Sequence, residues 1–344
     1  MKRSIIMLLM ATMALLLVVT GCQNPAVTSA KIYLNTNQDP DKAIEQCKLA
    51  IQQVPTDPEA YYLMGRAYAM KKMFPEMNDA FTNSLKNGPK FQAEIDQERN
   101  VQWAGLLNAG VSLYQNDKAK EAAEKFEMAT TILPEKANTW KYLGSAYAQS
   151  DNNMKAIEAF KKAIELDAAD YESYYQIANL YYAEKNYEEA ISNYMVIIEK
   201  AGTASKFYAD AMSRAGICYD ILGQPQKAQE IYEKALTENP EDMNMRFNMG
   251  RIFLQDKKYD KALEMFQPVY DANPDNYENA MSIGWATIEL KNFEDAVKYF
   301  KKATEMKPEN HQAWFWLGTA YVRAGDSDNG KIAFDKSDEL KKSE

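Results

Sequence analysis

Seven glycines recur along this chain inside one fixed frame of apolar residues, and several neighbours in the set stand 34 residues apart. They are Gly65, Gly110, Gly144, Gly216, Gly250, Gly284 and Gly318. A period of this length indicates a repeated supersecondary unit, and stacked units form an array in which length adds repeats rather than depth of core. This repeat constrains the fold more than any other feature. We call the position of the recurring glycine the glycine slot.

Each unit predicts two amphipathic helices. An aromatic or long apolar residue stands four before the glycine slot, an apolar residue one before and an aromatic three after, and these offsets share one face of a helix. Twelve residues after the slot a second helix carries a small, an aromatic and a small residue, as in Ala296, Phe300 and Ala303. A proline, which cannot sit in a helix interior without losing a hydrogen bond, closes several units: Pro89, Pro134, Pro240, Pro274 and Pro308.

This pattern resembles the tetratricopeptide repeat family, whose helix–turn–helix units have a 34-residue period. The resemblance implies an all-α fold, a right-handed superhelical solenoid over residues 39–344. One copy departs from the pattern because Ala178 replaces the glycine. The expected repeats are a partial copy at about 24–57 and full copies at 58–91, 103–136, 137–170, 171–204, 209–242, 243–276, 277–310 and 311–344.

Two insertions interrupt the period. Gly65 and Gly110 are 45 residues apart, and Ala178 and Gly216 are 38 apart, so the insertions contain 11 and 4 residues. Both lengths are close to whole helical turns, so the packing face keeps its phase. We expect the next first helix to be lengthened N-terminally, by about three turns from Phe91 and about one turn from Ser205, and to project as a docking knob. Loops are the alternative.

The first 21 residues predict a signal peptide. Lys2 and Arg3 precede an apolar run from residue 5 to residue 19, which is short for a membrane span. The run ends in Thr20, Gly21 and Cys22, which resembles a bacterial lipoprotein signal. That resemblance implies acylation of Cys22, with residues 22–38 as a lipidated tether and degenerate first helix of at most about 50 Å. An uncleaved signal anchor is the alternative. By the same resemblance, Gln23 favours the periplasmic face of the outer membrane.

The net charge of the chain limits the classes of partner that it can bind. Without Lys2 and Arg3 the chain has 38 basic and 49 acidic residues, a balance of −11. Such an acidic surface disfavours nucleic acid, whose phosphates require basic patches, and also disfavours electrostatic adhesion to anionic lipid.

Nothing in the sequence predicts an enzyme, a cofactor or a metal site. His311 is the one histidine, and no nucleotide-binding, zinc-binding or nucleophile motif is present. Cys47 and Cys218 belong to the first and sixth units, too far apart for a disulfide, and both fall in packing positions. We expect both thiols to be buried and free.

A second stripe on the first helices predicts the binding surface. The family resemblance places first helices on the concave face, and residues three before, one after and four after the slot should then line the groove. They are more apolar than a solvated face requires, and aromatic, Met and Arg residues are typical of protein interfaces. Some could instead be packing between neighbouring first helices. The predicted groove residues are Tyr62, Arg66, Tyr114, Tyr175, Asn179, Tyr182, Phe247, Arg251, Met281, Trp285 and Phe315.

These features favour a membrane-anchored scaffold of the bacterial cell envelope that binds peptide or helical segments of envelope proteins in its groove. The lysine–asparagine carboxylate clamp of chaperone-binding family members is not reproduced, because the corresponding slots hold Lys141 with Ser145 and Tyr175 with Asn179. Glycan or peptidoglycan binding is an alternative, because aromatic rings also stack on sugars. A further alternative, by fold analogy, is an assembly factor for outer-membrane, pilus or secretion machinery.

Overall fold

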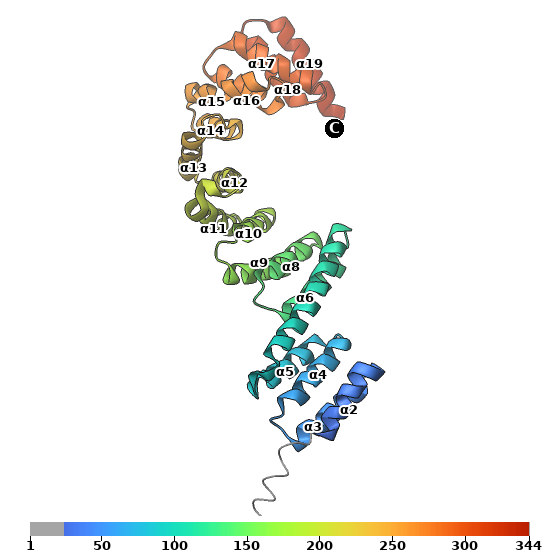
Figure 1. Cartoon of the computed structure of the whole chain (residues 1–344). Helices are drawn as coiled ribbons and strands as arrows, with labels where there is room; N and C mark the ends of the chain where they lie inside the picture. Colours follow the sequence, from blue (N-terminus) through green and yellow to red (C-terminus); the bar gives the residue numbers. More distant parts are fainter. Residues whose placement is uncertain (1–23, 344) are drawn as a thin grey trace, which may run out of the picture. The chain divides into compact units, whose positions relative to one another are not determined.

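The computed structural model describes residues 24–343, which are helical throughout and include no β-strand (Figure 1). The signal peptide and Cys22 lie outside this part of the chain. The chain divides into two compact units between Ala168 and Ala169. None of the described helices is long and apolar enough to cross a membrane. The expected all-α fold is confirmed.

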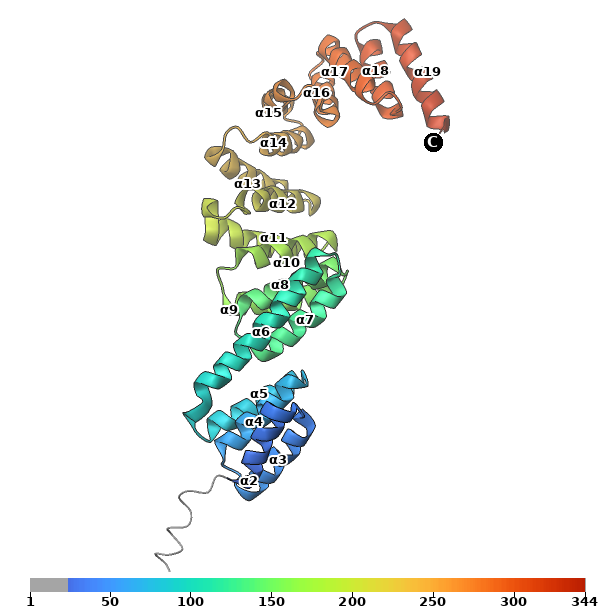
Figure 2. The same cartoon turned by 45° about the vertical axis from the view of Figure 1, so that its right-hand side comes forward.

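Unit 1 consists of consecutive antiparallel helices (Figures 1 and 2). Its α-helices are α2 (Pro25–Ile32), α3 (Pro40–Gln53), α4 (Pro58–Met70), α5 (Phe74–Lys86), α6 (Gln92–Gln115), α7 (Ala119–Ile132), α8 (Ala137–Gln149) and α9 (Asn153–Leu166). A π-helical turn, η1 (Tyr33–Asn37), follows α2, and a 3₁₀ turn, η2 (Pro89–Phe91), precedes α6.

Unit 2 repeats the same arrangement. Its α-helices are α10 (Tyr171–Ala183), α11 (Tyr187–Val196), α12 (Tyr208–Ile221), α13 (Pro225–Glu238), α14 (Met243–Gln255), α15 (Tyr259–Ala272), α16 (Tyr277–Glu289), α17 (Phe293–Met306), α18 (His311–Arg323) and α19 (Ser327–Ser343). A π-helical turn, η3 (Ile197–Ala201), and a 3₁₀ turn, η4 (Gly202–Ala204), separate α11 from α12. Asp170, Asp242, Asn276 and Asn310 cap first helices with side-chain oxygens, which satisfy backbone N–H groups that have no helical partner.

The glycine slot exists because an aromatic ring of the second helix occupies the place of its side chain. A Cβ atom on Gly65 would lie 2.4 Å from Phe81, and one on Gly284 would lie 2.7 Å from Phe300. Both rings are fully buried. The same contact recurs at each of the seven glycines, so the ring of the second helix sets how closely the two helices of a repeat approach.

A left-handed residue closes the turn between the two helices of each full repeat, seven positions after the glycine slot. Only two of these positions hold glycine, Gly223 and Gly325. The others are Lys72, Asp117, Asp151, Lys185, Lys257 and Lys291, with φ between 58° and 63°. In this conformation the Cβ atom of an L-residue comes too close to the following carbonyl oxygen, which is energetically unfavourable, so these turns carry strain.

The first repeat is better formed than its sequence predicts. Residues 24–38 do not form an extended tether, because α2 begins at Pro25, with the Asn24 side chain accepting a hydrogen bond from the Ala26 N–H. Val27, Ala30 and Leu34 are buried in one cluster with residues of α3 and α4. The upper limit of about 50 Å for an extended lead is therefore not reached, since the apolar residues of this segment pack against the array.

The two insertions have different structures. The 11-residue insertion is helical as predicted, and α6 is 24 residues long. It does not project freely, because Phe91 and Ile95 are buried beside α4 and α5. Arg99 donates from Nε to Asn78 Oδ1 of α5 at 2.9 Å. The prediction for the 4-residue insertion is wrong: α12 begins at Tyr208, and the chain between α11 and α12 forms η3, η4 and the turn after them.

Cys47 and Cys218 are free thiols with no exposed surface, as predicted. Burial raises the pKa of Cys47 to about 12 and that of Cys218 to about 11, because a low-dielectric surrounding disfavours the thiolate. Both side chains act as small apolar groups in the packing.

Candidate functional site

The predicted groove residues lie on first helices of both units. In unit 1, Tyr62 and Arg66 lie on α4 and Tyr114 on α6. In unit 2, α10 carries the set at 175, 179 and 182, α14 carries Phe247 and Arg251, and α16 carries Met281 and Trp285, while Phe315 lies on α18. The structure brings four of them together in one hollow of unit 2.

That hollow has a volume of about 300 Å³ and lies between α14, α16 and α18. We call it the Trp285 hollow. A volume of this size accommodates a large side chain or a short ligand segment. It is lined by Phe247, Arg251, Tyr277, Glu278, Met281, Ser282, Trp285 and Gln312.

Apolar side chains form its walls. The Phe247 ring packs on Phe266 with ring centroids 5.6 Å apart, and the Trp285 indole meets Trp316 edge to face at 5.9 Å. Met281 was predicted to line the groove, but it is only 4% exposed and contributes a buried wall. The aromatic contacts hold the rings in place, which lowers the entropy cost of binding against them.

Polar and charged residues also line the hollow. Trp285 Nε1 is buried and has no hydrogen-bond partner in the structure. Arg251 Nη2 lies 3.9 Å from Asp220 Oδ2, and the Arg251 side chain remains 46% exposed. Glu278 Oε1 accepts from Lys307 Nζ at 3.3 Å. A buried N–H without a partner costs free energy, and because this atom has almost no accessible surface, a ligand oxygen reaches it only if the indole ring turns.

A second polar group lies on α10 and α12. Arg214 Nε donates to Asp210 Oδ2 at 3.1 Å, and its guanidinium lies 5.7 Å from the centre of the Tyr182 ring. The Tyr175 hydroxyl donates to the same carboxylate. Arg214 is not among the predicted groove residues because it stands two positions before the glycine slot, off the predicted stripe. The available signal was the opposite charge of Asp210, four residues earlier on the same face of α12.

Asn179 has a structural role that the sequence did not predict. Its Oδ1 accepts a hydrogen bond of 2.6 Å from the hydroxyl of Tyr194, which is completely buried. Tyr194 occupies the place of the second-helix aromatic ring, and in this repeat Ala178 replaces the glycine. Burial raises the pKa of the Tyr194 hydroxyl. A buried hydroxyl is unfavourable without a hydrogen bond, and the Asn179 oxygen provides the acceptor.

Both insertions cover a predicted groove tyrosine. Phe91 stacks on Tyr62 and Phe207 on Tyr175, each pair with ring centroids 4.6 Å apart. Arg66 lies 5.9 Å from the Tyr62 ring, with Nη1 3.4 Å from Asn35 Oδ1. These tyrosines therefore present less ring surface to a ligand than the sequence suggested. Tyr114 is half-buried, and Phe315 remains 47% exposed.

Within residues 24–343, no group of three or more His, Cys, Asp or Glu side chains is placed to hold a metal ion. The polar residues of the Trp285 hollow include one arginine, one glutamate, one serine and one glutamine, without a nucleophile activated by a neighbouring base. The arrangement is suited to binding.

Four family models described as tetratricopeptide repeat match the chain, at residues 143–170, 170–237, 222–283 and 282–338. Together they cover more than half of its length. The chain belongs to the tetratricopeptide repeat family.

Several curated proteins are similar to this chain over part of their length. Tetratricopeptide repeat protein 37 of Xenopus laevis is 26% identical over 236 residues, which are 58% of this chain and 15% of the relative. Superkiller protein 3 of Schizosaccharomyces pombe is 25% identical over 215 residues, 62% of this chain and again 15% of the relative. The aligned part is thus a small fraction of these proteins.

Solved structures with the same helical repeats include MamA of Desulfovibrio magneticus, with 23% identity and a TM-score of 0.48 over 51% of this chain and 97% of that one. Another is PilF of Pseudomonas aeruginosa, with 17% identity and a TM-score of 0.48 over 61% and 94% of the two chains.

Proposed function

We propose that this tetratricopeptide repeat protein is an interaction scaffold that acts by binding protein segments rather than by catalysis. The Trp285 hollow carries the proposal, because apolar walls, an exposed arginine and an unpaired buried N–H meet in one place on the first helices. These are the features of a site that receives an apolar side chain and fixes the neighbouring main chain or carboxylate by hydrogen bonds.

In this mechanism a partner inserts an apolar side chain between Phe247 and Trp285. Arg251 pairs with an acidic group of the partner, and the indole of Trp285 turns so that a carbonyl or carboxylate oxygen of the partner accepts from Nε1. Arg251 is available because its contact with Asp220, at 3.9 Å, is a long ion pair at an exposed site. An extended peptide or one face of a helix provides such groups at the required spacing.

We further propose that the chain is a lipoprotein of the bacterial cell envelope, anchored through Cys22 on the periplasmic face of the outer membrane. The apolar run before Thr20-Gly21-Cys22 supports this proposal. The first described helix starts at Pro25, the third residue after Cys22. Acylation there would hold the first repeat close to the lipid surface and restrict partners to a thin layer.

Two matched substitutions test the binding site. We expect Trp285→Phe to keep the apolar wall but remove the donor, weakening capture of the partner by about tenfold while folding is unchanged or slightly more stable. Trp314→Phe is the control, because its Nε1 already donates to the Pro308 carbonyl at 2.8 Å and lies outside the hollow. It should lower stability and leave capture unchanged.

The partner is identified by crosslinking in living cells from a photoreactive residue at position 285 or 247, read by mass spectrometry. A specific envelope protein at both positions supports the proposal. If neither position yields a protein crosslink, the groove assignment is wrong. The anchor is tested separately: Cys22→Ser should abolish incorporation of labelled fatty acid and release the chain from membranes. Unchanged labelling would exclude Cys22 as the acylated residue.

A further inference from the structure

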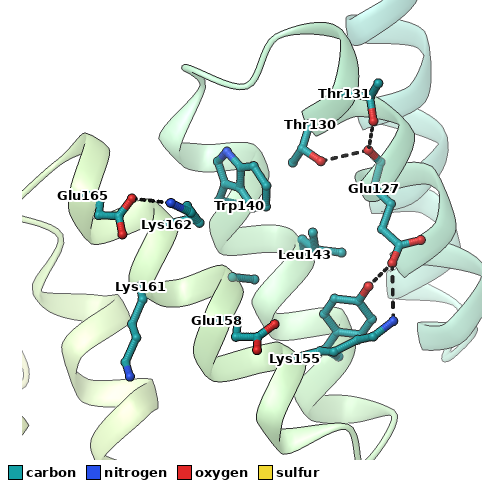
Figure 3. Close-up of a pocket in the computed structure, with 12 residues that line it drawn as sticks. Glu127, Thr130, Thr131, Trp140, Leu143, Lys155, Glu158, Lys161, Lys162 and Glu165 are labelled. Atoms are coloured by element: carbon teal, nitrogen blue, oxygen red, sulfur yellow. Dashed lines mark hydrogen bonds and ion pairs between the residues drawn. The ribbon is translucent and has the colours of Figure 1, made fainter. Parts of the chain in front are cut away.

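A second hollow lies in unit 1, on different helices from the Trp285 hollow. It has a volume of about 600 Å³ and is bounded by α7, α8 and α9 (Figure 3). Trp140, Leu143 and Ala159 form its apolar floor. The Trp140 indole N–H donates to the Pro134 carbonyl at 2.7 Å, so the ring is held in one orientation. We call this site the Trp140 hollow.

The hollow exists because two side chains are small. At the corresponding place between repeats 243–276 and 277–310, Tyr270 and Tyr299 meet edge to face with centroids 5.1 Å apart and fill the space. Thr130 and Ala159 stand at the same repeat positions in the Trp140 hollow. The hollow therefore results from the small side chains of these two repeats. The way the helices pack is common to the whole array and does not account for it.

The same combination of residues occurs once more. Trp314, Thr304 and Ala333 stand at the repeat positions of Trp140, Thr130 and Ala159, and they line a hollow of about 300 Å³ in unit 2. The rim differs, because Ile332 replaces Glu158 and Asn329 replaces Lys155. The chain thus contains a smaller, more apolar counterpart of the same pocket, which serves as an internal control.

The rim of the Trp140 hollow is polar and balanced in charge. Glu127 lies 3.8 Å from Lys155 and also accepts from the Tyr147 hydroxyl, while Lys162 and Glu165 pair at 2.6 Å (Figure 3). Three glutamates and three lysines line the site in total. A charged ligand gains little from a rim that is already neutralised, and it would have to disrupt these pairs.

We propose that the Trp140 hollow binds a short uncharged oligosaccharide. A sugar ring has an apolar C–H face that packs on an indole, and its hydroxyl groups both donate and accept hydrogen bonds. The rim offers both kinds of partner, since glutamate carboxylates accept and lysine ammonium groups donate. A purely apolar side chain would pack on the floor of the hollow, but it would form no hydrogen bonds with the glutamates and lysines of the rim. This site is independent of the protein-binding groove, so either proposal can fail alone.

The test fills the hollow with a side chain that the repeat already tolerates. In Ala159→Tyr the new ring occupies the position that Tyr299 occupies in its own repeat, so the fold should be retained. The full chain is titrated by calorimetry with chitotetraose, cellotetraose and maltotetraose, and melting is followed by circular dichroism. We expect at least one sugar to bind, with affinity lowered by about tenfold or more in Ala159→Tyr.

Ala333→Tyr fills the counterpart hollow and should leave sugar binding unchanged, as should Trp285→Phe. Binding that survives Ala159→Tyr would overturn the assignment of the site. Absence of binding by all three sugars up to about 10 mM would overturn the ligand class. If a peptide that carries an apolar side chain shields the Trp140 ring from solvent and no sugar does so, the hollow is a peptide site.

Discussion

Phe91 stacks on Tyr62 with ring centroids 4.6 Å apart and ring planes inclined by only 5°. Phe207 stacks on Tyr175 at the same distance, with planes inclined by 18°. The two insertions differ in length and in secondary structure, yet each places a phenylalanine on the tyrosine three positions before the glycine slot. The insertions therefore cover parts of the stripe on the first helices that the regular repeats leave open.

The first prediction concerns this cover. We expect Phe91→Ala to destabilise unit 1 by about 3 kcal/mol, because the ring is 8% exposed and its removal leaves a cavity beside Tyr62. Hydrogen exchange of α4 and α6 measures the effect. Val101→Ala on α6, the helix that follows Phe91, is the control, since Val101 is 60% exposed and should change stability by less than about 0.5 kcal/mol. Equal effects of the two substitutions would contradict the packing role of the insertion.

The second prediction concerns the glycine slot. Gly284→Ala places a methyl group 2.7 Å from the Phe300 ring and should cost roughly 2 kcal/mol by overpacking. Gly105→Ala is the matched control, because Gly105 lies inside α6 and a Cβ atom there meets nothing within 4 Å. That substitution should stabilise the helix by about 0.5–1 kcal/mol. Denaturant unfolding of both variants measures the difference, and a shared sign would refute the explanation.

The third prediction concerns strain in the turns. Lys291 has φ of 62°, a conformation that glycine adopts without a Cβ clash. We expect Lys291→Gly to raise the free energy of unfolding by about 0.5–1 kcal/mol, because relief of strain exceeds the added entropy of the unfolded chain. The reverse change at the equivalent position, Gly325→Lys, should lower it. Thermal melts of the two variants provide the measurement, and a loss of stability in Lys291→Gly would show that the turn is unstrained.

The fourth prediction concerns alkaline pH. Burial raises the pKa of Cys218 from 9.0 to about 11, so between these values the unfolded chain loses a proton that the folded chain keeps. The contribution of this thiol to stability is fully present below pH 9 and is lost as the pH rises towards 11. Urea unfolding at pH 8 and pH 10.5 should show a smaller decline in Cys218→Ala than in the parent chain. A decline of equal size would mean that Cys218 does not titrate as described.

The sequence indicated where the helices of the regular repeats lie because the apolar residues recur at helical spacing and are read from local positions alone. It also indicated that the four residues at 247, 251, 281 and 285 belong to one stripe. It did not indicate the unpaired N–H of Trp285, because hydrogen-bond satisfaction depends on which neighbours surround an atom. Nor did it indicate that the 4 extra residues lie in the connection before α12, because 4 residues fit equally well as a helical turn or as a connection.

The recurring glycine and its aromatic partner were sufficient to determine the repeat, the pairing of helices and the burial of the two cysteines, since each depends on periodic contacts within one unit. Tertiary structure decided which predicted residues remain open to a ligand. Phe91 covers Tyr62, and Phe207 covers Tyr175. The side-chain oxygen of Asn179 already accepts a hydrogen bond from the Tyr194 hydroxyl. The reason is physical. The space left for a ligand, and the hydrogen-bonding groups left without a partner, depend on side chains from several helices. The sequence of a single repeat does not contain all of these side chains.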